Sequence, residues 1–354
     1  MQELTARRVD REAIPLGTEQ QPILELEEET MIKTPRRAVI SLLVLLMLTF
    51  TFGSVCGAES ALGTVPKPSK SYRVGVLLKT LANEWWVAYM DGCKETAKEY
   101  GVQLEFFAAS TEGDVQRQLE TLETMVRKGY DALMVSPITE YNLLPGLVKA
   151  TKAGIPVVLV AEPISEEVRK QEGIKLETFI DADNRGAGRV AAEYMSRKLA
   201  KGSKVLIIEG MAGSPGSQMR VGGFEEAAKQ LGALSIIASQ AGNWDRLTAM
   251  NITMATLKVH PDLKAIYAAN DTMALGAAEA VASSSAAGKV MIIGTDAIPS
   301  ALDTIKEGRM AGTVDLDPGT MGRLSVESVI AALEGVKIPP YMASQVKLIT
   351  RDNL

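Results

Sequence analysis

Short runs of aliphatic and β-branched residues alternate with amphipathic stretches along the chain from Ser71 onward. Short apolar runs indicate buried strands, and apolar residues at helical spacing indicate helices that cover a sheet. This alternation is typical of βα units on a parallel sheet. The expected strands are Arg73–Leu78, Val102–Phe107, Ala132–Ser136, Val157–Val160, Thr178–Ile180, Lys204–Ile208, Ser235–Ala238, Ala265–Ala268, Val290–Ile293 and Gly312–Val314.

The strands fall into two sets, the first ending near Ile180 and the second beginning at Lys204. A chain of 354 residues is also too long for one typical domain. A weak internal repeat supports two similar lobes, because residues 127–137 and 260–271 both pass from a helix end through an Asp and an aliphatic strand into a polar loop. Glycines 101, 129, 154 and 232 each follow a helical run, and we expect them to end helices.

The N-terminus carries an export signal. Lys33, Arg36 and Arg37 precede an uncharged apolar run, residues 38–55, which is the layout of a signal peptide. The small residues that follow, 56–58, suit cleavage before Glu59. We therefore expect residues 31–58 to be a cleaved signal peptide, with an uncleaved membrane anchor as the alternative.

Lipidation at Cys56 is disfavoured, because the three residues before it, 53–55, lack the expected large aliphatic side chain. Residues 1–30 are polar and end in an acidic cluster, which is unusual ahead of a signal peptide. We expect them to be a non-native or disordered extension, and either Met1 or Met31 is the true start.

Composition excludes several classes of function. A net charge of -5 and a pI near 5.3 argue against a basic surface that binds the phosphates of nucleic acid. Beyond the signal segment the chain has one cysteine, Cys93, and one histidine, His260, so we expect no Cys/His catalytic pair, metal cluster or cofactor. Residues 210–216 are glycine-rich but lack the Gly-Lys-Ser/Thr of a phosphate loop. An enzyme is therefore not expected.

Candidate binding residues gather where the expected strands end, which is where open α/β sheets bind ligands. Lys79, Asn83, Trp85 and Trp86 follow the first strand, and Trp244 follows another. Indole rings offer flat apolar faces to the C–H groups of a sugar and an N–H donor to its hydroxyls. Packing in the core is the alternative role for these tryptophans.

Arg220, Asn270 and Asp296 occupy the corresponding loops of the second half. Such side chains supply fixed donors and acceptors for hydroxyl groups. A helix N-cap is the alternative role for Asn270, and a surface salt bridge is the alternative for Arg220.

In these segments the chain resembles the type I periplasmic binding proteins, most closely the ribose-binding group. The resemblance extends from about Tyr72 to Leu348 and rests on TLANEWW with DGCKETA (80–97), ADNRGAG (182–188), GSPGSQMRVGGF (213–224), NWDR (243–246), AANDTMALGA (268–277) and IGTDAIP (293–299). It implies two flavodoxin-like, doubly wound lobes joined by a hinge of three crossings. The first lobe would comprise 71–182 and 316–337, and the second 183–315 and 338–354.

The resemblance also implies that Asn83, Trp85 and Trp86 contact the ligand from the first lobe, and Arg220, Trp244, Asn270 and Asp296 from the second. Two departures concern the ligand. Where the family frequently has Asp-Arg, this chain has Ala161-Glu162, and where a Gln is common it has Asp315-Leu316. Glu162 joins the expected site on this ground, with Lys79 and Asp315 as weaker candidates, and the exchange argues against ribose itself.

We therefore expect a monomeric, periplasmic binder of a sugar, polyol or related molecule that serves the permease and ATPase of an ABC importer. The alternative is a ligand sensor that presents its bound state to a chemoreceptor or sensor kinase. A transcriptional regulator built from the same lobes would need a helix-turn-helix before Ser71, where the apolar segment stands instead.

Overall fold

The computed structural model describes residues 62–354. The sequence expectations for the N-terminal extension, the signal peptide, its cleavage and lipidation at Cys56 lie outside these residues. Within them, no helix is long and apolar enough to cross a membrane.

The first lobe is built on a six-stranded parallel sheet with the order β11-β5-β4-β3-β1-β2. Its strands are β1 (Arg73–Thr80), β2 (Gln103–Ala109), β3 (Ala132–Val135), β4 (Val157–Val160), β5 (Thr178–Ala182) and β11 (Tyr341–Ser344). Its helices are α2 (Glu84–Tyr100), α3 (Val115–Lys128), α4 (Leu144–Lys152), α5 (Glu166–Glu172) and α11 (Pro318–Leu333).

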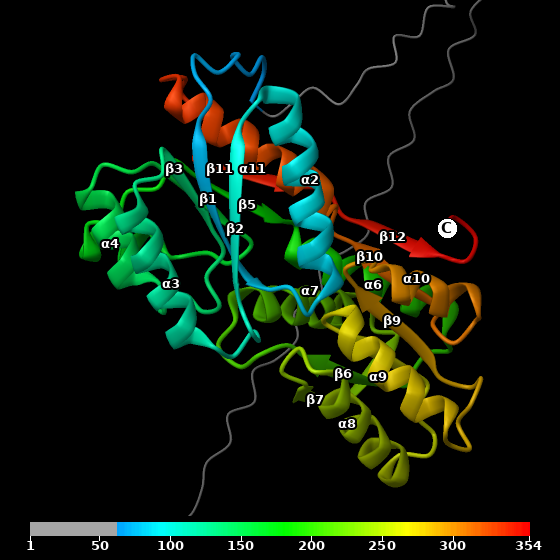
Figure 1. The fold of residues 1–354 in the computed structure, drawn as a ribbon. Coiled ribbons are helices and arrows are strands. Elements are labelled where there is room, and N and C mark those ends of the chain that lie inside the picture. Colours follow the sequence, from blue (N-terminus) through cyan, green and yellow to red (C-terminus); the bar gives the residue numbers. More distant parts are fainter. Residues whose placement is uncertain (1–61) are drawn as a thin grey trace, which may run out of the picture. The chain divides into compact units, whose positions relative to one another are not determined.

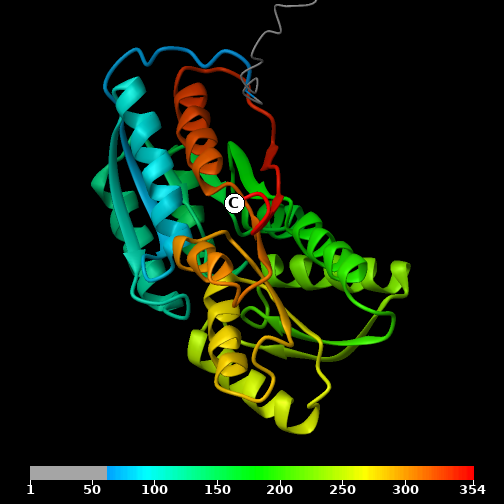
Figure 2. The same cartoon turned by 90° about the vertical axis from the view of Figure 1, so that its right-hand side faces the viewer.

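Strand β1 shows why this sheet is covered on both faces. Val74 and Val76 pack in one apolar cluster with α2 and α11, whereas Leu77 packs in another with α3 and α4. Because successive side chains of a strand point to opposite faces, a continuous apolar strand needs helices on both sides. Figure 1 shows α2 and α3 on opposite sides of the sheet, and Figure 2 shows α2 beside α11.

The second lobe has a six-stranded sheet with the order β12-β10-β9-β8-β6-β7, parallel except for β12. Its strands are β6 (Ser203–Glu209), β7 (Leu234–Ala241), β8 (Ala265–Ala268), β9 (Met291–Thr295), β10 (Gly312–Asp315) and β12 (Lys347–Thr350). Its helices are α6 (Asn184–Lys198), α7 (Pro215–Leu231), α8 (Arg246–Val259), α9 (Asp271–Ala282) and α10 (Pro299–Lys306).

The expected fold class is confirmed, and each expected strand is present with ends at most about three residues from those expected. The glycines expected at helix ends, 101, 129, 154 and 232, all have positive φ. Strands β11 and β12 were not predicted, since each has only four residues and lies partly exposed at a sheet edge.

The chain passes between the two sheets three times: after β5, after β10 and between β11 and β12. The third passage differs from the expected boundary, which assigned residues 338–354 to the second lobe. Strand β11 instead pairs with β5 of the first sheet, where Met342 is buried in the core, so the chain changes lobes only after Ser344.

Candidate functional site

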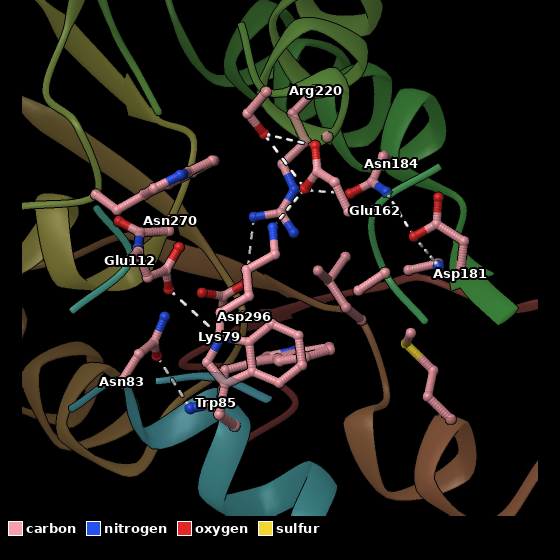
Figure 3. Close-up of a pocket in the computed structure, with 18 residues that line it drawn as sticks. Lys79, Asn83, Trp85, Glu112, Glu162, Asp181, Asn184, Arg220, Asn270 and Asp296 are labelled. Atoms are coloured by element: carbon pink, nitrogen blue, oxygen red, sulfur yellow. Dashed lines mark hydrogen bonds and ion pairs between the residues drawn. The ribbon is translucent and has the colours of Figure 1, made fainter. Parts of the chain in front are cut away.

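A pocket between the lobes gathers the carboxyl ends of strands from both sheets. It is lined from the first lobe by Lys79, Asn83, Trp85, Trp86, Glu112, Ala161, Glu162, Asp181, Ala182 and Met321, and from the second lobe and the crossings by Asn184, Ser214, Gly216, Arg220, Trp244, Asn270, Asp296 and Leu316. Figure 3 shows Lys79, Glu162 and Arg220 converging within it.

The start of α2 supplies the aromatic wall. Asn83 is the N-cap of this helix, and its Oδ1 accepts a hydrogen bond from the Trp85 backbone N–H at 3.0 Å. The cap fixes the first turn, so both tryptophans project from a rigid position. The two indoles meet edge to face at 4.7 Å between ring centroids, and Trp86 Nε1 donates to Glu112 Oε1 at 3.4 Å.

Both indoles are buried, yet Trp85 Nε1 has no hydrogen-bond partner among the described residues. A buried donor left without an acceptor costs about 1–3 kcal/mol. An acceptor on a bound molecule would remove that cost.

A buried ion pair joins Lys79, near the end of β1, to Glu162, just after β4. Ser214 of the second lobe adds a hydrogen bond from its Oγ to Glu162 Oε1 at 3.1 Å. Glu162 therefore connects a cation of its own lobe to a hydroxyl of the other lobe, and all three side chains are buried.

Arg220, on α7, organises the polar groups of the second lobe. Its Nε donates to Asn184 Oδ1 at 2.8 Å, and its Nη1 donates to the Ala269 carbonyl at 2.6 Å and to Asp296 Oδ1 at 3.3 Å. The guanidinium carbon also lies 5.7 Å from the Trp244 ring centroid. Because the Arg220 side chain is only 13% exposed, the surface salt bridge considered above does not describe it.

Asn270 fills both of the roles considered for it. Its Oδ1 accepts from the Met273 N–H at 2.9 Å as the N-cap of α9, and the residue also lines the pocket. The neighbouring Asp271 is buried beneath the pocket, where it accepts hydrogen bonds from Thr313 Oγ1 and the Ile298 N–H.

Two pocket carboxyl groups have strongly shifted acidities. Burial raises the pKa of Asp181 to about 7, although the Ala182 N–H and nearby Arg220 oppose the shift. Burial likewise raises the pKa of Asp296 to about 7, and the adjacent Arg220 guanidinium only partly offsets it. These carboxyl groups change protonation near neutral pH.

Backbone strain in the described residues is concentrated at this pocket. The non-glycine residues with positive φ are Ala161, Asn243, Trp244, Asp296, Ala297 and Asp317, and each lines the pocket or adjoins a residue that does. Such conformations cost on the order of 1–3 kcal/mol each and cluster at functional sites. Here they set the directions of Trp244 and Asp296.

The pocket brings together every candidate residue named from the sequence except Asp315. Asp315 instead ends β10, and its carboxylate accepts from the Asp317 N–H at 2.8 Å. The lining residues that were not among the predicted site residues are Glu112, Ala161, Asp181, Ala182, Asn184, Ser214, Gly216, Leu316 and Met321. Asp181 directly follows an expected strand and Glu112 lies in the loop after another, so inspecting the loop after every expected strand would have found them.

Within the described residues no group of three or more His, Cys, Asp or Glu side chains is placed to hold a metal ion. The pocket therefore offers hydrogen-bond donors and acceptors, buried charges and aromatic faces. Such a combination can bind a compact polar molecule through many directed contacts.

Comparison with known proteins agrees with this chemistry. Residues 74–337 match the model of the periplasmic binding protein domain. The chain belongs to this periplasmic binding protein family. Among its relatives, the D-allose-binding periplasmic protein of Escherichia coli is 37% identical over 77% of this chain and 89% of its own length. The ribose import binding protein of Bacillus subtilis is 31% identical over 87% of this chain and 98% of its own.

A solved family member has the same architecture. The periplasmic solute-binding protein of an ABC transporter from Actinobacillus succinogenes, crystallised with bound D-allose, superposes with a TM-score of 0.76. It is 30% identical and covers 80% of this chain and 98% of its own.

Proposed function

We propose that this periplasmic binding protein captures a monosaccharide between its two lobes and delivers it to the permease and ATPase of an ABC importer. The observation that carries the proposal is the pocket itself, whose polar groups come from both lobes and meet at the bond from Ser214 to Glu162. The D-allose- and ribose-binding relatives support a sugar as the ligand.

Each wall of the pocket has a role in this proposal. Trp85, Trp86 and Trp244 cover the apolar C–H faces of the sugar, and the orphan Nε1 of Trp85 donates to one of its oxygens. Arg220 and Asp296 bind hydroxyls from the second lobe, while Asn83, Lys79 and Glu162 bind from the first. Both walls belong to one chain, so a monomer suffices.

Periplasmic delivery requires export, for which residues 31–58 would be the removable signal. N-terminal sequencing of protein from the native host tests this part. A mature chain that begins near Glu59 supports it, and recovery of an intact Met1 in the soluble cytoplasm contradicts it.

The ligand is testable with a thermal-shift series of D-allose, D-ribose and related sugars and polyols. A ligand that binds only the native state raises the melting temperature progressively with its concentration. Calorimetric titration then tests the site. Asp296→Ala removes a buried acceptor and should weaken binding roughly 10- to 150-fold without unfolding the protein. Unchanged affinity for both Asp296→Ala and Arg220→Ala would contradict the assignment.

A further inference from the structure

Four residues of the pocket lining have aliphatic side chains. Ala161, Ala182, Leu316 and Met321 all line the pocket, and none has a side-chain hydrogen-bond donor or a strong acceptor. Ala182, Leu316 and Met321 are buried, and Ala161 packs against the same apolar cluster, which also contains Trp85 and Trp86. We call these four residues the aliphatic wall.

The aliphatic wall is fixed by backbone contacts at the crossings between lobes. The Ala161 N–H donates to the Ile180 carbonyl of β5 at 2.8 Å, and Ala182 at the end of β5 pairs with Ser344 of β11. Ser344 Oγ in turn donates to the Leu316 carbonyl at 2.6 Å. These contacts join the three segments that carry Ala161, Ala182 and Leu316, while Met321 comes from α11.

Asp181 and Asn184, close to Ala182 in sequence, are hydrogen-bonded to each other. Asp181 Oδ1 accepts from the Ala182 N–H at 2.8 Å and from Asn184 Nδ2 at 2.9 Å, while Asn184 Oδ1 accepts from Arg220 Nε. A ligand hydroxyl directed at the aliphatic wall would lose its water partners and meet methyl and thioether groups. Burying a hydroxyl without a partner is unfavourable, whereas burying a methyl group is favourable.

We propose that the sugar presents a deoxygenated carbon to the aliphatic wall, so that the protein prefers 6-deoxyhexoses, with their methyl group at C6, over the corresponding hexoses. This inference rests on the proposed function and specifies the class of sugar. Hydroxyls elsewhere on the ring face the Lys79–Glu162 ion pair and Arg220 with its partner Asp296.

Calorimetric titration with matched sugars tests the preference. The pairs are D-allose with 6-deoxy-D-allose, D-galactose with D-fucose, and L-mannose with L-rhamnose, and D-ribose is titrated separately. In the pair whose ring stereochemistry fits, the 6-deoxy member should bind about 10- to 100-fold more tightly, because its partner must bury an unpaired hydroxyl.

Equal or weaker binding of the 6-deoxy member in every pair that binds overturns the inference. Binding of D-ribose or a hexose without any 6-deoxyhexose overturns it as well, and leaves the proposed function intact. If none of these sugars binds, the proposed function fails together with the inference.

Leu316→Gln provides a second test, because it places an amide donor and acceptor in the aliphatic wall at similar side-chain length. The preference for the 6-deoxy sugar should fall to within about threefold or reverse. The C6 hydroxyl of the hexose loses its bond to water on binding, and the Gln amide replaces that bond with one of similar strength. Leu316→Met is the matched control, which keeps the wall apolar and should keep the preference. A preference that Leu316→Gln leaves unchanged would contradict a role for the wall.

Discussion

Ser214 and Glu162 form a direct hydrogen bond between the two lobes, with 3.1 Å from Ser214 Oγ to Glu162 Oε1. Ser214 is also the N-cap of α7, where its Oγ accepts from the Ser217 N–H. The second lobe therefore fixes the position of the Ser214 hydroxyl, and that hydroxyl bonds to Glu162 of the first lobe. Glu162's other partner, Lys79, is in its own lobe, so of these two contacts only the bond to Ser214 crosses between the lobes.

Glu162→Gln should reduce stability sharply. The substitution retains the shape of the side chain but leaves the buried Lys79 without its counter-ion. Removing one partner of a buried pair typically costs about 3–5 kcal/mol of unfolding free energy. Urea unfolding of the ligand-free protein measures the change. The double variant Lys79→Met with Glu162→Leu should recover much of it, since no unpaired charge remains.

Glu166→Gln is the matched control, because Glu166 pairs with Lys170 on the exposed surface of α5. Solvent screens such a pair, and its loss should hardly move the unfolding midpoint. If Glu162→Gln lowered the unfolding free energy no more than Glu166→Gln does, the buried pair would not contribute to stability.

Asp181 and Asp296 both contribute to the pH dependence of stability. The pKa of each carboxyl is about 7 in the folded protein and near 3.8 when exposed. Between these values the native state holds more protons than the unfolded state, so the free energy of unfolding falls as pH rises. The fall is on the order of 4 kcal/mol per group and is complete above about pH 7.

Chemical denaturation at pH 5 and pH 8 measures this slope at constant ionic strength. Asp296→Asn should flatten it, because the amide does not titrate. An unchanged slope in that variant would show that Asp296 ionises normally despite its burial.

Much of the fold was predictable because its central strands are buried on both faces and therefore form uninterrupted apolar runs. Strands β11 and β12 lacked that signal. In β11 the alternation of exposed and buried residues covers only Tyr341–Ser344, too short a stretch to distinguish from a loop. The neighbour that makes it a strand, β5, is more than 150 residues away in sequence, and local pattern does not reveal such pairing.

Asp315 and Leu316 show what the sequence could not predict about the site, namely which of two adjacent residues faces the pocket. Sequence reasoning favoured the polar residue of the two, but Leu316 lines the pocket. Adjacent residues in extended chain point in opposite directions, so composition alone cannot decide which one faces a ligand. That depends on the register of β10, which its pairing with β9 and β12 determines.

Gly210→Ala should weaken ligand binding with little effect on the fold. A Cβ at position 210 would lie 2.0 Å from Trp244 Cζ2 and 2.1 Å from Cη2, so the indole must move. Gly210 does not have a positive φ, and the alanine backbone is therefore unstrained. Displacing the ring removes the aromatic contact proposed between Trp244 and the sugar, and should weaken binding about 10-fold.

Gly222→Ala is the control for this substitution, since the position lies within α7 and the nearest contact of an added Cβ is 4.0 Å away. Alanine favours a helix over glycine, so this variant should retain affinity and gain slightly in stability. Tryptophan fluorescence of the ligand-free proteins should change in Gly210→Ala alone, because only there does Trp244 move. If Gly210→Ala bound sugar with wild-type affinity despite a changed emission, Trp244 would be a neighbour of the ligand and not a contact.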